Sequence, residues 1–193
     1  IYTALGIDNP RTATLAPAGT PLFETKKNAF APRFGISYLL RDSVNWSTTV
    51  RGGYGLFYDL PLGGLQAATG NPPYRRNVRA GGVPYPLPPN LATPPPPTTQ
   101  GRFDAIYGFA QDFSLPYAHQ FNFALEQGLG RNRTFSATYG GALGRNLLRR
   151  ETFSQPGAFQ TFDTVQIQRS DAASDYHSLQ LQFIERLNKN LQV

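Results

Sequence analysis

Side chains suited to catalysis or metal binding are few in this chain and lie far apart. It has no cysteine, and its two histidines are His119 and His177. A metal site at either would need carboxylates aimed at the imidazole ring. Asp171 and Asp175 are more readily explained as solvated loop acids than as ligands of a divalent ion. No Gly-x-Ser-x-Gly elbow supports a serine hydrolase, so we predict that the chain is not an enzyme and has no metal or cofactor.

The chain contains a glycine-rich run, Gly52-Gly53-Tyr54-Gly55. A phosphate-binding loop would continue into a helix and end in Lys-Ser or Lys-Thr, and neither feature is present. Glycines inside a strand more often mark bends or close packing of bulky neighbours. The net charge of +6 is compatible with nucleic-acid binding, but the basic residues form no stripe along a strand or helix. No nucleic-acid partner is therefore expected.

Aromatic and basic side chains occur together in a proline-rich stretch at 60–116. Such groups can bind a sugar, a siderophore or a lipopolysaccharide phosphate. From their position in a long loop, we hypothesise a ligand site formed by Tyr74, Arg75, Arg76, Arg79 and Tyr85.

The elements that would position these groups are strands. From 33 to 58, bulky side chains alternate with small or polar ones through two strands joined by a tight turn. The apolar set is Phe34, Ile36, Tyr38, Leu40, Trp46, Val50, Tyr54, Leu56 and Tyr58. Because successive side chains of a strand point to opposite faces, the pattern predicts a two-faced hairpin. An aromatic-rich face backed by a face with arginines and glycines is typical of a wall with lipid outside and water inside.

The same alternation continues along the chain. The predicted strands are 30–41, 46–59, 117–127, 134–144, 176–187 and a last one beginning at 191. The predicted short turns are 42–45, 128–133 and 188–190. Long loops are predicted at 60–116 and 145–175, with a short strand near 164–169. Since bacterial barrels have short periplasmic turns and long extracellular loops, we expect both long loops to be extracellular.

Composition agrees with a barrel. Charged residues make up 16% of the chain and aromatic residues 13%, and no apolar run reaches the roughly 18 residues of a membrane helix. The alternative spanning structure is a closed barrel, because lipid cannot satisfy open backbone groups. The predicted membrane-interface residues are Trp46, Tyr58 and Tyr117. The residues predicted to face the lumen include Arg33, Arg51, Gln120, Asn122 and Glu126. They would contact a plug or line a solute path, or else be solvated or pair with barrel neighbours.

Five motifs resemble the barrel of TonB-dependent outer-membrane receptors, in particular the Oar-like group of acidobacterial type with a carboxypeptidase-regulatory-like domain. They are NAFAPRFG (28–35), VRGGYGLFYD (50–59), PYAHQFN (116–122), ATYGGALGRNLL (137–148) and YHSLQLQ (176–182). The resemblance covers about residues 28–59 and 114–193. It implies a large plugged barrel in the bacterial outer membrane, with a plug domain and a TonB-contacting segment that lie outside this chain. The implied partners are outer-membrane lipid, lipopolysaccharide and an unknown solute.

The predicted fold is thus all-β: an antiparallel up-and-down meander forming part of a transmembrane barrel, an open curved sheet of about six strands. The chain has no methionine and no signal peptide, so we expect 1–193 to be a fragment of a single barrel domain. The predicted function is that of a wall segment of a TonB-dependent transporter. An alternative is a surface adhesion or assembly protein on a passive barrel. A soluble β-sandwich would instead bury the apolar faces together.

Overall fold

The computed structural model of the chain describes residues 2–25, 27–75, 81–83, 85–93, 96–188 and 191–192. The chain forms two compact units. Unit 1 consists of Ile1–Lys26, Leu60–Ser114 and Leu148–Asp171. Unit 2 consists of Lys27–Asp59, Leu115–Leu147 and Ala172–Val193. Within the described residues, the helices are too short or too polar to cross a membrane.

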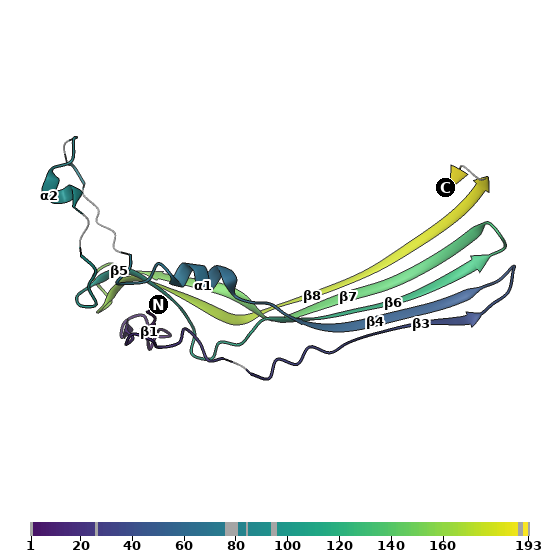
Figure 1. Cartoon of the computed structure of the whole chain (residues 1–193), viewed down its shortest axis with the longest axis horizontal. Helices are drawn as coiled ribbons and strands as arrows, with labels where there is room; N and C mark the ends of the chain where they lie inside the picture. Colours follow the sequence, from purple (N-terminus) through teal and green to yellow (C-terminus); the bar gives the residue numbers. More distant parts are fainter. Residues whose placement is uncertain are drawn as a thin grey trace. The chain divides into compact units, whose positions relative to one another are not determined.

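Unit 2 is a sheet of long antiparallel strands, which lie side by side in a single curved layer (Figure 1). Its strands are β3 (Arg33–Arg41), β4 (Thr48–Tyr58), β6 (Tyr117–Leu129) and parts of β7 (Arg133–Ser154) and β8 (Phe162–Asn188), with β9 (Leu191–Gln192) paired to β8. The strand order is β3-β4-β6-β7-β8. This meander confirms the predicted fold class of a partial β-barrel.

The register of unit 2 follows the alternation of the sequence. Phe34 lies opposite Tyr54, and Tyr54 lies opposite Phe121. On the neighbouring rung, Arg33 lies opposite Gly55, and Gly55 opposite Gln120. Directly opposed residues of paired strands share a face, so the bulky and the polar residues of the three strands separate onto two faces as predicted.

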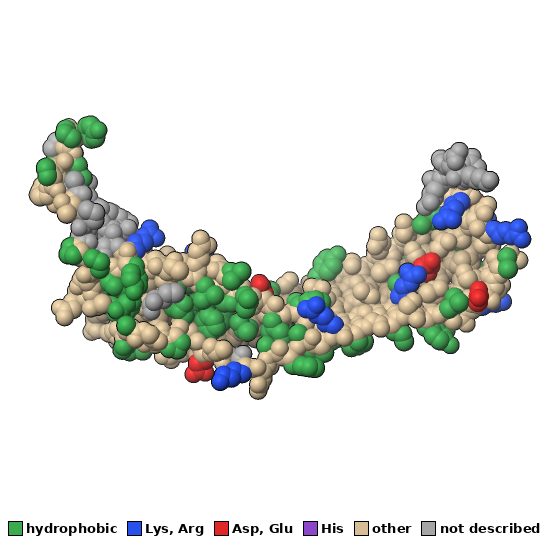
Figure 2. Space-filling model, in the orientation of Figure 1, with side chains coloured by type: hydrophobic (Ala, Val, Ile, Leu, Met, Phe, Trp, Pro, Cys, Tyr) green, Lys and Arg blue, Asp and Glu red, His purple; other side chains and the backbone are tan. Residues whose placement is uncertain are grey.

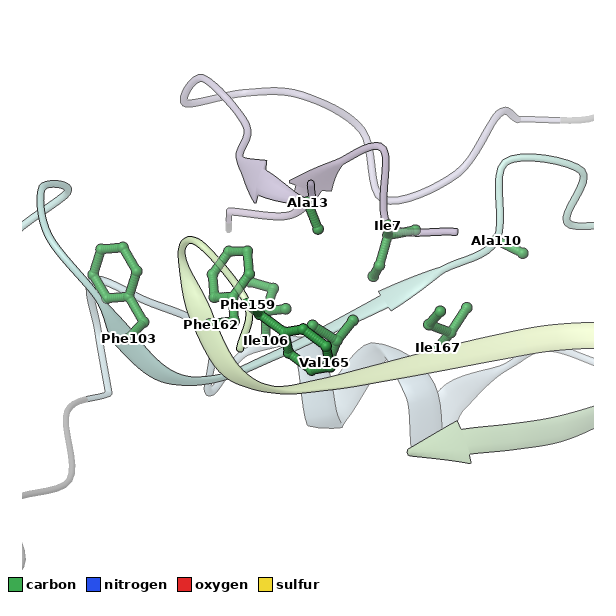
Figure 3. Close-up of a cluster of buried hydrophobic side chains, with 9 residues drawn as sticks. All are labelled: Ile7, Ala13, Phe103, Ile106, Ala110, Phe159, Phe162, Val165 and Ile167. Atoms are coloured by element: carbon green, nitrogen blue, oxygen red, sulfur yellow. The ribbon is translucent and has the colours of Figure 1, made fainter. Parts of the chain in front are cut away.

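Unit 1 has a hydrophobic core drawn from three separate stretches of the chain. It contains β1 (Ala4–Leu5), β2 (Thr14–Leu15), α1 (Leu62–Ala68), α2 (Pro89–Ala92), β5 (Phe103–Phe109), the C-terminal part of β7 and the N-terminal part of β8. The core cluster is Ile7, Ala13, Phe103, Ile106, Ala110, Phe159, Phe162, Val165 and Ile167. Figure 3 shows these side chains between β5, β8 and the N-terminal segment. β5 pairs with β8 in parallel, from Phe103 opposite Phe162 to Phe109 opposite Gln168.

Polar contacts hold the N-terminal segment of unit 1 against its sheet. The buried Asn71 amide donates to the carbonyl oxygens of Tyr2 and Tyr107 and accepts from the Tyr107 N–H. Arg169 on β8 forms an ion pair with Asp8 at 2.9 Å. The Ile7 side chain occupies the space beside Gly108, where a Cβ would overlap its Cδ1 atom. The segment is therefore fixed by packing and by hydrogen bonds.

Unit 1 differs from the loops predicted at 60–116 and 145–175. β7 continues to Ser154 and β8 begins at Phe162, so the prediction that 145–175 is a loop is wrong except for the short connection between those two strands. The expected short strand near 164–169 is part of β8. The strand β5 was not predicted, because its residues stand among prolines and glycines and its partner lies far along the chain. Long-range packing supplies the order that local sequence does not indicate.

Candidate functional site

The apolar face of unit 2 has no packed layer over it among the described residues. Phe34 is 67% exposed, Phe123 53% and Leu181 61%. Further exposed side chains are Ile36, Tyr38, Leu40, Tyr139, Leu179 and Phe183. Figure 2 shows hydrophobic side chains at the molecular surface. A soluble domain rarely leaves so many neighbouring large apolar side chains uncovered, and the buried arrangement required by a β-sandwich is absent from this part of the chain.

Aromatic rings and both histidines lie together on this apolar face. The Tyr54 hydroxyl is 2.6 Å from His119 Nδ1, and the Tyr139 hydroxyl is 2.8 Å from His177 Nδ1. The Tyr139 and His177 rings are stacked, with an interplanar angle of 15°. Each histidine thus has a tyrosine partner on a neighbouring strand. These partners were not predicted from the sequence, because the strand register alone brings the pairs together.

The predicted interface residues lie at strand ends. Tyr58 and Tyr117 are opposite one another, with ring centroids 5.9 Å apart. Trp46 lies in the turn before β4, two residues earlier than the strand begins, and is exposed. Amphipathic rings at such positions are typical of the boundary between hydrocarbon and headgroups.

The polar face of unit 2 carries the five residues predicted to face the lumen. Arg51 and Glu126 form an ion pair at 3.3 Å. The Asn122 amide lies over Gly53, with both of its terminal atoms within 3.5 Å of the place where a Cβ would be. Arg33, Gln120 and Asn122 line an open groove of about 410 Å³. The alternation in the sequence therefore identified this face. In the structure, the face carries a neutral ion pair and, beside it, a groove.

Phe57 is a member of this groove that sequence reasoning did not assign. Its ring lies across Gly55, where a Cβ would be 2.6 Å from ring atom Cε2. The central carbon of the Arg33 guanidinium is 4.2 Å from the centroid of the same ring. The alternation of the strand could have identified it. Residues 53, 55 and 57 of β4 are two apart, so Phe57 lies on the same face as Gly53 and Gly55.

The ligand site hypothesised in the long loop is only partly assembled in unit 1. Arg76 and Arg79 lie outside the described residues. Arg75 lines a hollow of about 370 Å³ together with Asp104, Thr164 and Gln166. Tyr74 is exposed with its ring centroid 6.0 Å from that of Tyr2, and Tyr85 is 98% exposed. Of the three described residues, only Arg75 reaches this hollow.

An ionic network joins β7 and β8 within unit 1. Arg149 pairs with Glu151 and Asp171, and Arg169 pairs with Glu151. The hydrogen bond from Arg169 is the largest cause that holds the pKa of Glu151 below its ordinary value, and that from Arg149 does the same to the pKa of Asp171. In unit 2, Asp175 pairs with Arg145. Both acids that were expected to be solvated in a loop are thus paired with arginines on strands.

Comparison with known protein families agrees with this geometry. A family model described as "Outer membrane beta barrel domain" matches residues 5–193. A search of curated proteins found no match. The match extends over nearly the whole chain, through both compact units.

Proposed function

The chain belongs to the outer membrane beta-barrel domain family, and from that premise we propose that it is a wall segment of a TonB-dependent receptor that moves a solute across the outer membrane. Membership of the family places the chain in the bacterial outer membrane as barrel wall. The proposal adds the class of receptor, the energy source and the transported solute.

One observation carries the proposal: an uncovered apolar face is backed by a polar face that holds a groove and an ion pair. An apolar exterior is required of any transmembrane barrel, whereas a polar interior wall suits a barrel that encloses water, solute or a plug. The five motifs that resemble TonB-dependent receptors lie in or at the ends of the strands of this wall. Within this chain, the support for a receptor comes from these motifs and from the polar groove.

In the proposed mechanism, the chain supplies a surface and no chemistry. Solute would move along the polar face, and a plug domain would contact the same side chains. Energy would reach the barrel from the inner membrane through TonB. Lipid and lipopolysaccharide would contact the apolar face and its aromatic residues at the strand ends.

Binding to TonB tests the receptor class directly. The full-length protein, purified in detergent, would be applied to immobilised periplasmic domain of TonB in a surface-plasmon-resonance measurement. We expect saturable binding that is lost when the segment preceding the plug is deleted. Absence of binding by a folded protein, identified by its heat-modifiable migration on a gel, would overturn the TonB-dependent proposal.

A passive barrel that mediates adhesion or assembly is the second candidate. The packed core of unit 1 is compatible with it, since a packed body built from loop-length segments suits attachment to a surface as well as capture of a solute. The TonB measurement separates the two candidates, because a passive barrel is not expected to bind TonB.

A further inference from the structure

We propose that Arg33 and the groove around it bind a carboxylate or phosphate group of the solute. This inference rests on the proposed transport function for its physiological meaning, but the binding step stands on the geometry of unit 2 alone. Three features of unit 2 support it: the charge of the groove, the position of the guanidinium, and the glycines of the lining.

The groove carries an unbalanced positive charge. Among the described residues, Arg33 forms no ion pair and no side-chain hydrogen bond, whereas Arg51 on the same face is neutralised by Glu126. The other polar side chains that line the groove are uncharged: Gln120, Asn122, Tyr176 and Ser178. No carboxylate of the described residues lines it. A groove of this charge attracts anions and gives a cation no partner.

Phe57 holds the guanidinium in a position to bind. The central carbon of the Arg33 guanidinium lies over the face of the Phe57 ring, where a π system attracts a cation. The N–H donors lie in the guanidinium plane and form a rigid fork that matches the oxygens of a carboxylate or phosphate. The cation–π contact therefore restricts the side chain without forming a hydrogen bond to its N–H groups. Such restriction lowers the entropy that is lost when an anion binds.

Glycines let the side chains of the groove lie close to the sheet. Gly53, Gly55 and Gly140 are part of its lining. The Asn122 amide lies over Gly53, the Phe57 ring over Gly55, and the Ser178 hydroxyl near Gly140. The Phe57 ring can occupy this position only because residue 55 has no Cβ. The amides of Gln120 and Asn122, with the hydroxyl groups of Tyr176 and Ser178, surround the space with neutral hydrogen-bonding groups. These groups can bind the hydroxyl or carbonyl oxygens of a solute while Arg33 binds its acidic group.

Chemical modification tests whether Arg33 is free and whether an anion covers it. The full-length protein in detergent would be treated with phenylglyoxal, and the modification of each arginine followed by peptide mass spectrometry. Citrate and inorganic phosphate are the probes, and mannitol is the neutral control. We expect modification at Arg33 to be slowed severalfold by citrate or phosphate and unchanged by mannitol. Arg51 is the internal control, because its partner Glu126 should keep its rate independent of the probes.

Isothermal titration calorimetry with the same probes tests which residues contribute to anion binding. We expect Arg33→Gln to weaken binding by about tenfold or more, as loss of a charge-assisted hydrogen bond does. Arg33→Lys should be intermediate, since it keeps the charge without the fork, and Phe57→Leu should weaken binding with the charge intact. The matched control is Arg51→Gln, which should bind normally.

Two results would overturn the proposal. The first is equal binding by Arg33→Gln and the unmodified protein. The second is slow modification of Arg33 that no probe alters, which would mean that a carboxylate from another part of the full-length protein already occupies it. Neither result depends on TonB. Anion binding without TonB binding would leave the site intact and remove the receptor proposal, and the converse would remove only the site.

Discussion

At the scale of single residues, glycines in the strands of unit 2 create space that a neighbouring aromatic ring fills. The Phe121 ring lies across Gly141 on the apolar face, and the Phe57 ring lies across Gly55 on the polar face. A Cβ at either glycine would overlap ring atoms. This confirms the interpretation of the glycine-rich run as a packing feature of a strand. It also explains how a ring can lie over the backbone of a neighbouring residue in a sheet in which side chains normally stand upright.

Replacing one of these glycines should disturb the ring above it. Gly141→Ala is expected to destabilise the barrel by about 1 kcal/mol, the lower end of the range for overpacking, because the Phe121 ring can move outward. Gly52→Ala is the matched control, since the nearest atoms to a Cβ there are 3.6 and 3.8 Å away. Urea unfolding of the full-length protein in lipid vesicles measures both. Equal stability of the two variants would contradict the packing role of Gly141.

The ionic network of unit 1 should make that unit sensitive to acid. A carboxyl group whose pKa is lowered in the folded state adds stability that is present above its unfolded pKa and is lost as the pH falls through the folded pKa. The ordinary pKa of a glutamate side chain is about 4.3. In the folded protein, Arg169 lowers the pKa of Glu151. Backbone amides at 148–171 should therefore lose protection from hydrogen exchange below about pH 4.3. In Glu151→Gln, protection should be lower at pH 7 and should change less with pH.

Protection factors correct for the intrinsic effect of pH on exchange, so they isolate the contribution of the network. Asp163, which pairs with Arg102 in the same unit, provides the control substitution Asp163→Asn. An identical pH dependence in Glu151→Gln and in the unmodified protein would remove the role assigned to this carboxylate.

At the scale of the strand, alternation decides which substitutions the wall tolerates. Leu179, Leu181 and Phe183 of β8 are all more than half exposed. Ser178 is next to Leu179 in this strand and lies on the opposite, polar face. Its hydroxyl donates a hydrogen bond to the Gly140 carbonyl oxygen and lines the polar groove. One strand therefore presents side chains to both environments, and neighbouring positions in the sequence should respond differently to the same change.

An arginine placed at two adjacent positions of β8 measures this difference. Leu181→Arg is expected to cost about 2–4 kcal/mol, the penalty for arginine facing the bilayer midplane, and Gln180→Arg far less. Folding of the full-length protein into phosphatidylcholine vesicles, followed across a urea series, gives both free energies. Equal penalties would mean that the two faces have been assigned wrongly.

The strand is also the scale at which sequence reasoning succeeds. A period of two residues is a local property, so the apolar set around Phe34 and the polar set around Arg33 could be assigned without knowing any contact. The partners across strands could not be assigned in the same way. The Tyr54–His119 pair and the Arg33–Phe57 contact depend on register and on side-chain direction, which the period alone does not determine.

At the scale of the whole molecule, the chain divides into a wall and a second body with its own core. The core of unit 1 joins Ile7, Ile106 and Val165, which come from three separate stretches of sequence. No local pattern marks them as partners, and the prolines between 60 and 100 indicate a loop. Long loops were therefore predicted in stretches where long-range apolar contacts form a packed core.

The core of unit 1 can be tested by truncating one side chain. Ile167 is fully buried, and Ile167→Ala should cost about 2–5 kcal/mol of the local stability of unit 1, as large-to-small core substitutions do. Leu62→Ala is the control, because Leu62 is 66% exposed. Limited trypsin digestion of the full-length protein should cleave within 60–116 faster in the first variant only. Unchanged cleavage of Ile167→Ala would indicate that the core does not order this segment.

The three-part composition of unit 1 has a consequence for the order of assembly. Ile7 can reach its partners only after β8 has been synthesised and brought alongside β5, and closing so large a loop is slow relative to pairing adjacent strands. The hairpin of β3 and β4, whose residues are close in sequence, can form long before. Folding should therefore proceed from the strands of unit 2 to the core of unit 1. A chain that stops between these two steps would expose Phe103, Ile106 and Phe109 to chaperones and proteases.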